Sequence, residues 1–132
     1  MTKYSIVLSN LVSPNTEISV FELYKDGESL IQQFLRSIEK DPKLLNQFSG
    51  AVNIVQRSAS YRRHMPKEKI RLIEGHKLDC KVYEAKKGKI RIYLFHQENT
   101  GRIIVTGGKK GNQKKDIKAV EKTIREFQTQ NT

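Results

Sequence analysis

Residues 89 to 96 constrain the fold more than any other stretch of this chain. Two sets of side chains alternate along them: Ile90, Ile92 and Leu94, interleaved with Arg91, Tyr93 and Phe95. Successive side chains of a β-strand point to opposite faces of its sheet. The pattern predicts a strand with one face in the core and the other presenting cationic and aromatic groups, which Lys81 and Tyr83 would join.

Similar patterns flank this strand. We expect strands over 78–86 and 102–106, joined to 89–96 by turns at Lys87-Gly88 and at residues 98–101. Gly107-Gly108 is expected to end the sheet. These segments predict a three-stranded antiparallel meander.

The first half of the chain changes from period two to helical spacing. Residues 17–24 are typical of a strand that ends at the turn Asp26-Gly27. Apolar residues at helical spacing then predict one helix from residue 28 to 38 and a second after Pro42, with Gly50 weakening its middle. Residues 4–8 predict a short edge strand or accessory arm.

A last amphipathic helix is expected from Asp116, with residues 128–132 fraying. The order β-α-α-β-β-β-α predicts an α+β fold with the helices packed on one face of a small antiparallel sheet. We expect a single domain over 1–132, with residues 1–16 as an N-terminal arm and 17–127 as the core.

Charge is distributed unevenly along the chain. The net charge is +11, and residues 1–56 carry 5 Lys/Arg against 6 Asp/Glu, whereas residues 57–132 carry 20 against 8. Such asymmetry favours a polyanionic partner, most simply nucleic acid, because cations near phosphates release condensed counterions. Anionic membrane surfaces are the alternative.

Residues 56–71 are strongly basic and contain Tyr61, His64 and Pro66. We interpret them as a loop, and a solvated linker and an arm that grips a nucleic-acid backbone are equally consistent with the pattern. The cationic residues expected to contact phosphates are Arg57, Arg62, Arg63, Lys86, Lys87, Lys89, Lys110, Lys114 and Lys115.

Several function classes are disfavoured. Carboxylates and cysteines are too few near the expected site for a two-metal or zinc centre, so we expect no metal and no cofactor. Residues 103–110 fail the phosphate-loop pattern because Ile103 replaces the first glycine and Lys110 the Ser/Thr. No apolar stretch approaches a membrane span, and the single Cys80 suits a reducing compartment, so a cytoplasmic location is expected.

Cleaving RNA without a metal requires a base for the 2′-hydroxyl, positive charge on the phosphate, and an acid for the 5′ oxygen. Lysine, arginine, tyrosine and histidine can supply all three. Alternatively, Arg91 and Tyr93 belong to a solvated strand face or to ordinary packing, which spacing alone favours. The same applies more strongly to His64, His76 and His96.

The second half of the chain also resembles a known family. The runs that carry the likeness are Ile70–Leu78, Lys81–Glu84, Ile90–Phe95, Ile103–Lys110 and Asp116–Ala119. Their order and spacing resemble the RelE/HigB superfamily of type II toxin–antitoxin toxins, most nearly its HigB-like, phage-derived branch. The resemblance implies a metal-independent mRNA endonuclease, acting on free or ribosome-bound mRNA, that forms a 2′,3′-cyclic phosphate and is neutralised by a cognate antitoxin.

Carried onto this sequence, the resemblance assigns phosphate contacts to Arg91, Lys109 and Lys110, and a cationic position to Lys81. We expect Lys81 as base, Arg91 and Lys109 as charge stabilisers, and Tyr93 or His96 as an orienting or acidic group. Thr106-Gly107-Gly108 stands where many HigB-like members carry His-Gly-Phe, so the family's C-terminal acid is absent there. A ParE-like gyrase-directed toxin and a non-catalytic nucleic-acid-binding module therefore stay open as alternatives.

Overall fold

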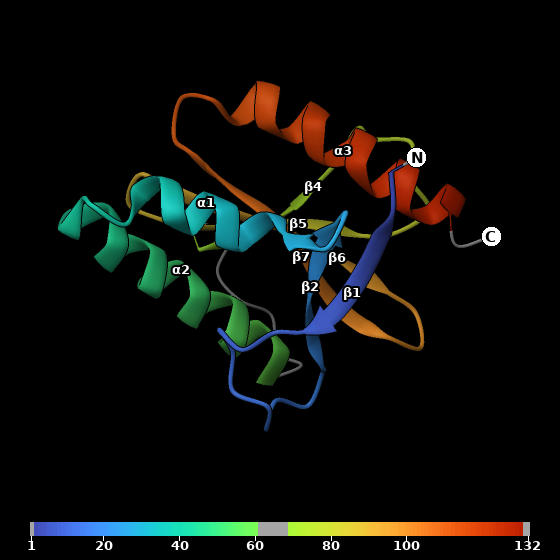
Figure 1. Cartoon of the computed structure of the whole chain (residues 1–132), viewed down its shortest axis with the longest axis horizontal. Helices are drawn as coiled ribbons and strands as arrows, with labels where there is room; N and C mark the ends of the chain where they lie inside the picture. The colour runs from blue at the N-terminus through green and yellow to red at the C-terminus, as the bar shows by residue number, and fades with distance from the viewer. Residues whose placement is uncertain (1, 61–68, 131–132) are drawn as a thin grey trace.

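A mixed β-sheet organises the described residues, which are 2–60 and 69–130 in this computed structural model (Figure 1). Its strands are β1 (Tyr4–Leu8), β2 (Val20–Lys25), β3 (Glu28–Ser29), β4 (Ile70–Ile73), β5 (Val82–Lys87), β6 (Ile90–Gln97) and β7 (Gly101–Lys109). They lie in the order β1-β2-β7-β6-β5-β4, with β3 paired to β2. Only the β2–β7 pairing is parallel. The predicted meander is present as β5, β6 and β7.

Within the described residues, three helices complete the α+β fold: α1 (Leu30–Ile38), α2 (Pro42–Ser60) and α3 (Gln113–Gln130). The Ser29 hydroxyl accepts a hydrogen bond from the Gln32 amide at the start of α1, and the Asp41 carboxylate accepts one from the Lys43 amide before α2. Each bond satisfies a backbone donor that the first turn leaves unpaired. The two helices predicted between the first core strand and the meander are confirmed.

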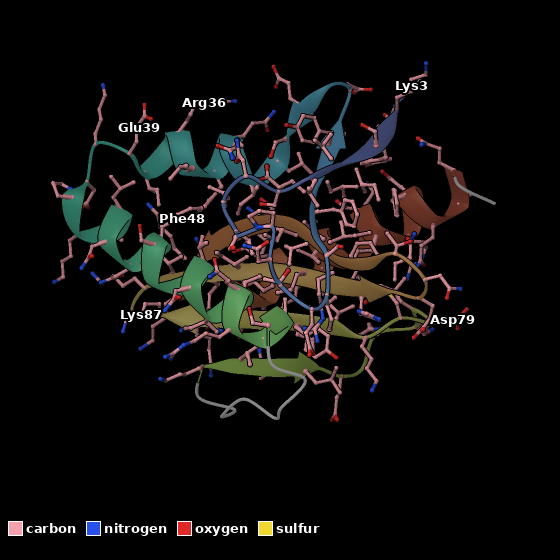
Figure 2. The ribbon with its side chains drawn as sticks, turned by 90° about the horizontal axis from the view of Figure 1, so that it is seen from below. Lys3, Arg36, Glu39, Phe48, Asp79 and Lys87 are labelled. Atoms are coloured by element: carbon pink, nitrogen blue, oxygen red, sulfur yellow. The ribbon has the colours of Figure 1, made fainter. Side chains whose placement is uncertain are left out.

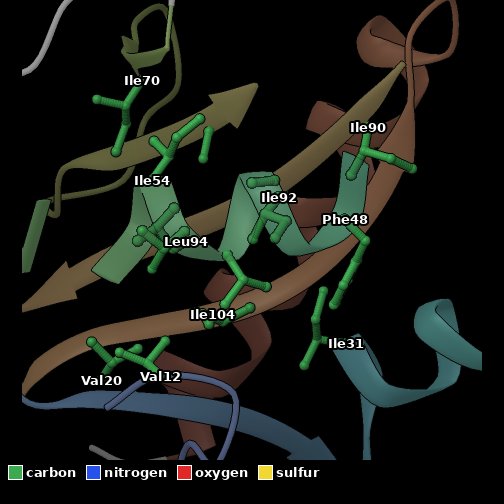
Figure 3. Close-up of a cluster of buried hydrophobic side chains, with 14 of the residues drawn as sticks. Val12, Val20, Ile31, Phe48, Ile54, Ile70, Ile90, Ile92, Leu94 and Ile104 are labelled. Atoms are coloured by element: carbon green, nitrogen blue, oxygen red, sulfur yellow. The ribbon is translucent and has the colours of Figure 1, made fainter. Parts of the chain in front are cut away.

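The helices cover both faces of the sheet, so the prediction of helices on one face is wrong. One apolar cluster packs Ile31 of α1 and Val55 of α2 against Ile92 and Leu94 of β6 (Figure 3). The other packs Ile124 and Phe127 of α3 against the opposite face, which includes Tyr93 and Phe95. The reason lies in β6 itself, whose two alternating sets are both largely apolar and both require burial.

Other boundaries also differ from the prediction. Residues 57–60 belong to α2 and residues 70–73 form β4, so the expected basic loop over 56–71 is wrong at both of its ends. Residues 61–68, in the middle of that segment, lie outside the described residues. The strand expected from residue 17 begins at Val20. Helix α3 begins at Gln113 and runs to Gln130, past the point where fraying was expected. The observed order therefore contains β3 and β4 besides the expected elements.

Gly107 and Gly108 continue β7 rather than end it. A Cβ atom at Gly107 would lie 2.3 Å from the Phe34 ring of α1, and one at Gly108 would lie 2.2 Å from the Asp116 carboxylate of α3. The two glycines thus allow a helix to approach each face of the same strand. This close approach explains a pattern that otherwise indicates a break.

Strand β1 forms one edge of the sheet, and α3 contacts it there. The Gln130 side chain accepts a hydrogen bond from the Tyr4 amide and donates one to the Tyr4 carbonyl oxygen, both at 2.7 Å. The Tyr4 hydroxyl donates to Glu126 at 2.7 Å. Burial and the neighbouring carboxylate raise the pKa of Tyr4 to about 12, so its hydroxyl stays protonated and keeps this contact. The expected edge strand over residues 4–8 is confirmed.

Candidate nucleic-acid interface

Three basic residues, Lys81, His96 and Arg102, lie in one row across the sheet. They are at the end of the meander where β5 begins, β6 ends and β7 begins. The His96 amide donates to the Lys81 carbonyl oxygen at 3.0 Å, and His96 is directly paired with Arg102 of β7. Neighbouring strands are about 4.8 Å apart. Residues opposite one another on adjacent strands share a face, so the three side chains emerge side by side.

This row borders a depression of about 650 Å³, which Tyr83, Asp79, Cys80, Glu98 and Gln128 also line. The Arg102 guanidinium lies 4.8 Å from the centroid of the Tyr83 ring, and its Nη1 donates to the Ser58 hydroxyl at 3.5 Å. Its Nε is buried without a hydrogen-bond partner among the described residues. Burial lowers the pKa of Arg102, although an arginine remains charged at neutral pH. The depression thus holds a fixed cation with an unused donor.

His96 is adapted to accept a proton at neutral pH. Burial lowers its pKa below 6.5, the charges of Arg102 and Lys81 lower it further, and Glu98 opposes them. Its Nδ1 is buried and has no hydrogen-bond partner among the described residues. In the tautomer that carries its proton on Nδ1, the Nε2 lone pair is free to accept a second proton. The ring is therefore mainly neutral at pH 7 and can act as a base.

The structure separates the predicted catalytic residues onto two faces. Arg91 and Tyr93 lie on the face covered by α3, whereas Lys81, Tyr83 and His96 lie on the opposite face, so the predicted shared cationic face is wrong. Arg91 is 6% exposed, and its Nη1 donates to the carbonyl oxygens of Gly88 and Ile90 at 2.8 and 2.9 Å. It also stands five residues from His96, about 17 Å along β6.

Tyr93 is fully buried beside Glu84, which is also fully buried. Burial raises the pKa of Glu84, but hydrogen bonds from Arg71 at 2.7 Å and Gln113 at 3.1 Å outweigh it, and the pKa is lowered overall. Burial and the Glu84 charge raise the pKa of Tyr93. The Tyr93 hydroxyl is near this carboxylate but not in good hydrogen-bond geometry with it. The group is a structural polar network without access for a substrate.

The predicted phosphate-binding residues lie in three places. Arg57, Lys86 and Lys87 line a second hollow of about 420 Å³ between α2 and β5, together with Lys69. Lys89, Lys110, Lys114 and Lys115 are exposed, as is Lys109, whose register position opposite Ile90 places it far from His96. Arg62 and Arg63 lie outside the described residues.

Arg102 was not predicted as a site residue. The available signal was the turn at residues 98–101: a tight hairpin there places the first residue after it near the last residues of the preceding strand. The other contacts of Arg102 are with Ser58 and Tyr83, and the hairpin pattern gives no indication of them.

No family model matches the chain, and comparisons with curated proteins and with solved structures found no match. Across residues 2–60 and 69–130, the side chains form no cluster of three His, Cys, Asp or Glu that could hold a metal ion. Within the same ranges no helix is both long and apolar enough to cross a membrane.

Proposed function

We propose that this protein is a metal-independent endoribonuclease that cleaves mRNA at the depression beside His96. The observation that carries the proposal is the row of Lys81, His96 and Arg102 in adjacent register positions on the wall of that depression. A base with a lowered pKa flanked by two cations meets the minimum requirement for cleaving RNA through its own 2′-hydroxyl.

In the proposed reaction, His96 Nε2 accepts the proton of the 2′-hydroxyl as that oxygen attacks phosphorus. Arg102 and Lys81 stabilise the negative charge that accumulates on the phosphate oxygens. The bond from phosphorus to the 5′ oxygen breaks, and the exposed Lys81 ammonium or a water molecule protonates the leaving oxygen. The products are a 2′,3′-cyclic phosphate and a 5′-hydroxyl, so a water molecule is not consumed.

This assignment changes the roles expected from the sequence. Arg91 and Tyr93 support the site through the fold, because both are buried under α3. Arg102, which is half-buried, takes the place of Arg91 as the cation facing phosphate. The Tyr83 ring makes a cation–π contact with the Arg102 guanidinium.

We also propose that the protein is a cytoplasmic type II toxin with a RelE/HigB-like fold and a cognate antitoxin as its protein partner. Support comes from the order of elements: β2 and the short β3 precede α1 and α2, β4 leads into the β5-β6-β7 meander, and α3 follows the meander. The second candidate function is nucleic-acid binding without cleavage, which the hollow beside α2 favours, because every charged residue that lines it is a cation.

The test is cleavage of a 5′-labelled RNA by purified protein in the presence of EDTA. We expect fragments ending in a 2′,3′-cyclic phosphate, and His96→Gln should lower the rate by about a hundredfold to ten-thousandfold. His76→Gln is the matched control, because His76 lies outside the depression. Binding of RNA without fragments would reject the nuclease and favour the binding module. Intact mRNA with damaged DNA after expression in a bacterium would indicate a gyrase-directed toxin.

A further inference from the structure

The hollow between α2 and β5 differs from the depression in the charges that line it. Four of its lining residues are cations, Arg57, Lys69, Lys86 and Lys87, and none is a carboxylate. Within the described residues, none of the four forms an ion pair with a carboxylate. The depression, by contrast, contains Asp79 and Glu98. We call the first hollow the α2 groove.

The α2 groove exists because α2 approaches β5 closely at a glycine. A Cβ atom at Gly50 would lie 2.7 Å from Cγ of Lys87, so Gly50 leaves space for the Lys87 stem beside the helix. Asn53 and Arg57 follow Gly50 at helical spacing and line the same groove. The groove thus presents ammonium, guanidinium and amide donors, with no carboxylate among its lining residues to neutralise the cations.

The last turn of α2 connects the groove with the depression. Arg57 lines the groove, while its neighbour Ser58 accepts a hydrogen bond from Arg102 of the depression. Strand β5 connects the two hollows a second time, because Tyr83 lines the depression and Lys87 the groove. Figure 2 shows Lys87 and Asp79, one lining residue of each hollow, at opposite ends of the sheet.

We propose that the α2 groove binds the phosphodiester backbone of the RNA strand whose cleaved bond lies at His96. Lys81 and Lys87 project from the same face of the sheet and are six residues apart, about 20 Å along a strand. A stacked strand advances about 3.4 Å per phosphate, so the bound phosphates lie about six nucleotides from the cleaved bond. The groove lacks a histidine or carboxylate among its lining residues, so it holds RNA without cutting it. This inference rests on the proposed function only for the position of the cleaved bond. Binding of RNA in the α2 groove does not depend on it.

Binding is tested with a labelled 2′-O-methyl oligouridylate of about 16 nucleotides, which spans the largest single-strand site sizes and cannot be cleaved. The affinity is measured between about 50 and 200 mM salt for the full-length protein and for two double variants. Lys86→Gln with Lys87→Gln should reduce the slope of log affinity against log salt by about 1.4, since each phosphate contact to a single strand contributes about 0.7. Lys118→Gln with Lys122→Gln, exposed on α3, is the matched control and should leave the slope unchanged.

Equal slopes for the two double variants would overturn the proposal. So would loss of binding to phosphatidylserine vesicles by the groove variant with an unchanged oligonucleotide slope, because that result assigns the groove to lipid headgroups.

Cleavage provides an independent readout. A dinucleotide has one phosphate and cannot reach from His96 to the groove, so the groove variant should cleave it at the normal rate while cleaving the long RNA more slowly. Equal slowing on both substrates would contradict the proposal. If the unmodified protein cleaves neither substrate, the proposed nuclease fails, whereas the salt slope still decides whether the groove binds RNA.

Discussion

The two faces of the β5-β6-β7 meander carry similar polar side chains in opposite circumstances. On the α3 face, Arg91, Tyr93 and Glu84 are buried and find partners within the protein or pack beneath the helix. On the α2 face, Lys81, His96 and Arg102 line a depression of about 650 Å³, and Arg102 donates a hydrogen bond to Ser58 in the last turn of α2. Chemical type alone does not distinguish the two sets. What distinguishes them is whether a helix covers the strand at that point.

A residue type that can take part in chemistry has a structural role where a helix covers the strand that carries it. The Arg91 Nη1 donates to two carbonyl oxygens and the side chain is almost fully buried, whereas the Arg102 side chain lines the open depression. The Nε of each arginine is buried without a partner among the described residues, but only that of Arg102 belongs to a side chain that a ligand can reach. A buried donor without a partner costs free energy, which an anionic ligand can recover. We therefore expect stability effects on the α3 face and functional effects on the α2 face.

The largest stability effect is expected from Tyr93→Ala. The side chain is fully buried between β6 and α3, so its removal leaves a cavity and should lower the free energy of unfolding by about 4 kcal/mol. Lys81→Ala, at an exposed position on the other face, should change it by less than about 0.5 kcal/mol. Urea unfolding of the three proteins checks both values. A Tyr93→Ala protein as stable as Lys81→Ala would remove the distinction between the faces.

A smaller effect is expected from Glu84→Gln, and it should depend on pH. The pKa of Glu84 is lowered in the folded protein, so its contribution to stability is present above its unfolded pKa of about 4.3 and is lost as the pH falls through the folded value. Arg71 is 40% exposed, so at pH 7 we expect a loss of about 2 kcal/mol rather than the 3–5 of a fully buried pair.

The measurement is the difference in unfolding free energy between the parent and Glu84→Gln, followed from pH 7 into the acid range. The difference should shrink on acidification, because the Glu84 carboxylate becomes protonated. A difference that stays constant with pH would mean that the ion pair with Arg71 does not contribute.

The smallest expected effect is on the α2 face, where it concerns the pKa of His96. Arg102→Gln removes one of the charges that lower the pKa of His96, while burial, the larger cause, remains. The His96 pKa should therefore rise toward 6.5 without passing it. An NMR titration of the His96 ring measures this directly, with Arg125→Gln on α3 as the control. No change in the His96 pKa would show that the two side chains do not interact.

Part of this architecture follows from local patterns in the sequence. The apolar spacing of α1 and α2, the Pro42 start and the alternation of β6 each act within one element, so they are visible without knowledge of the fold. Strand β4 was missed because its four residues, Ile70–Ile73, follow a basic segment and need β5 as a partner. Gly107 and Gly108 were misread because their function depends on Phe34 and Asp116, which are distant in sequence.

The candidate site was predicted less well than the fold. Alternation correctly groups Arg91 with Tyr93, but it contains no information about which face α3 will cover. Lys81 and His96 were both named, yet their adjacency depends on the register between β5 and β6, and Arg102 joins them through the β6–β7 register. Phe95 lies on the same face as Tyr93, and this apolar neighbour was the signal in the sequence that the face is buried.

The Gln130 amide on Tyr4 has a consequence for association between molecules. An exposed edge strand invites pairing with the edge of another chain, which is a route to aggregation. Outward-pointing backbone groups recur at every second residue, so after Tyr4 the next ones on this edge are at Ile6 and Leu8. Because Gln130 occupies the groups of Tyr4, an incoming strand meets only the end of β1. The last turn of α3 thus shortens the part of the β1 edge that can pair with another chain.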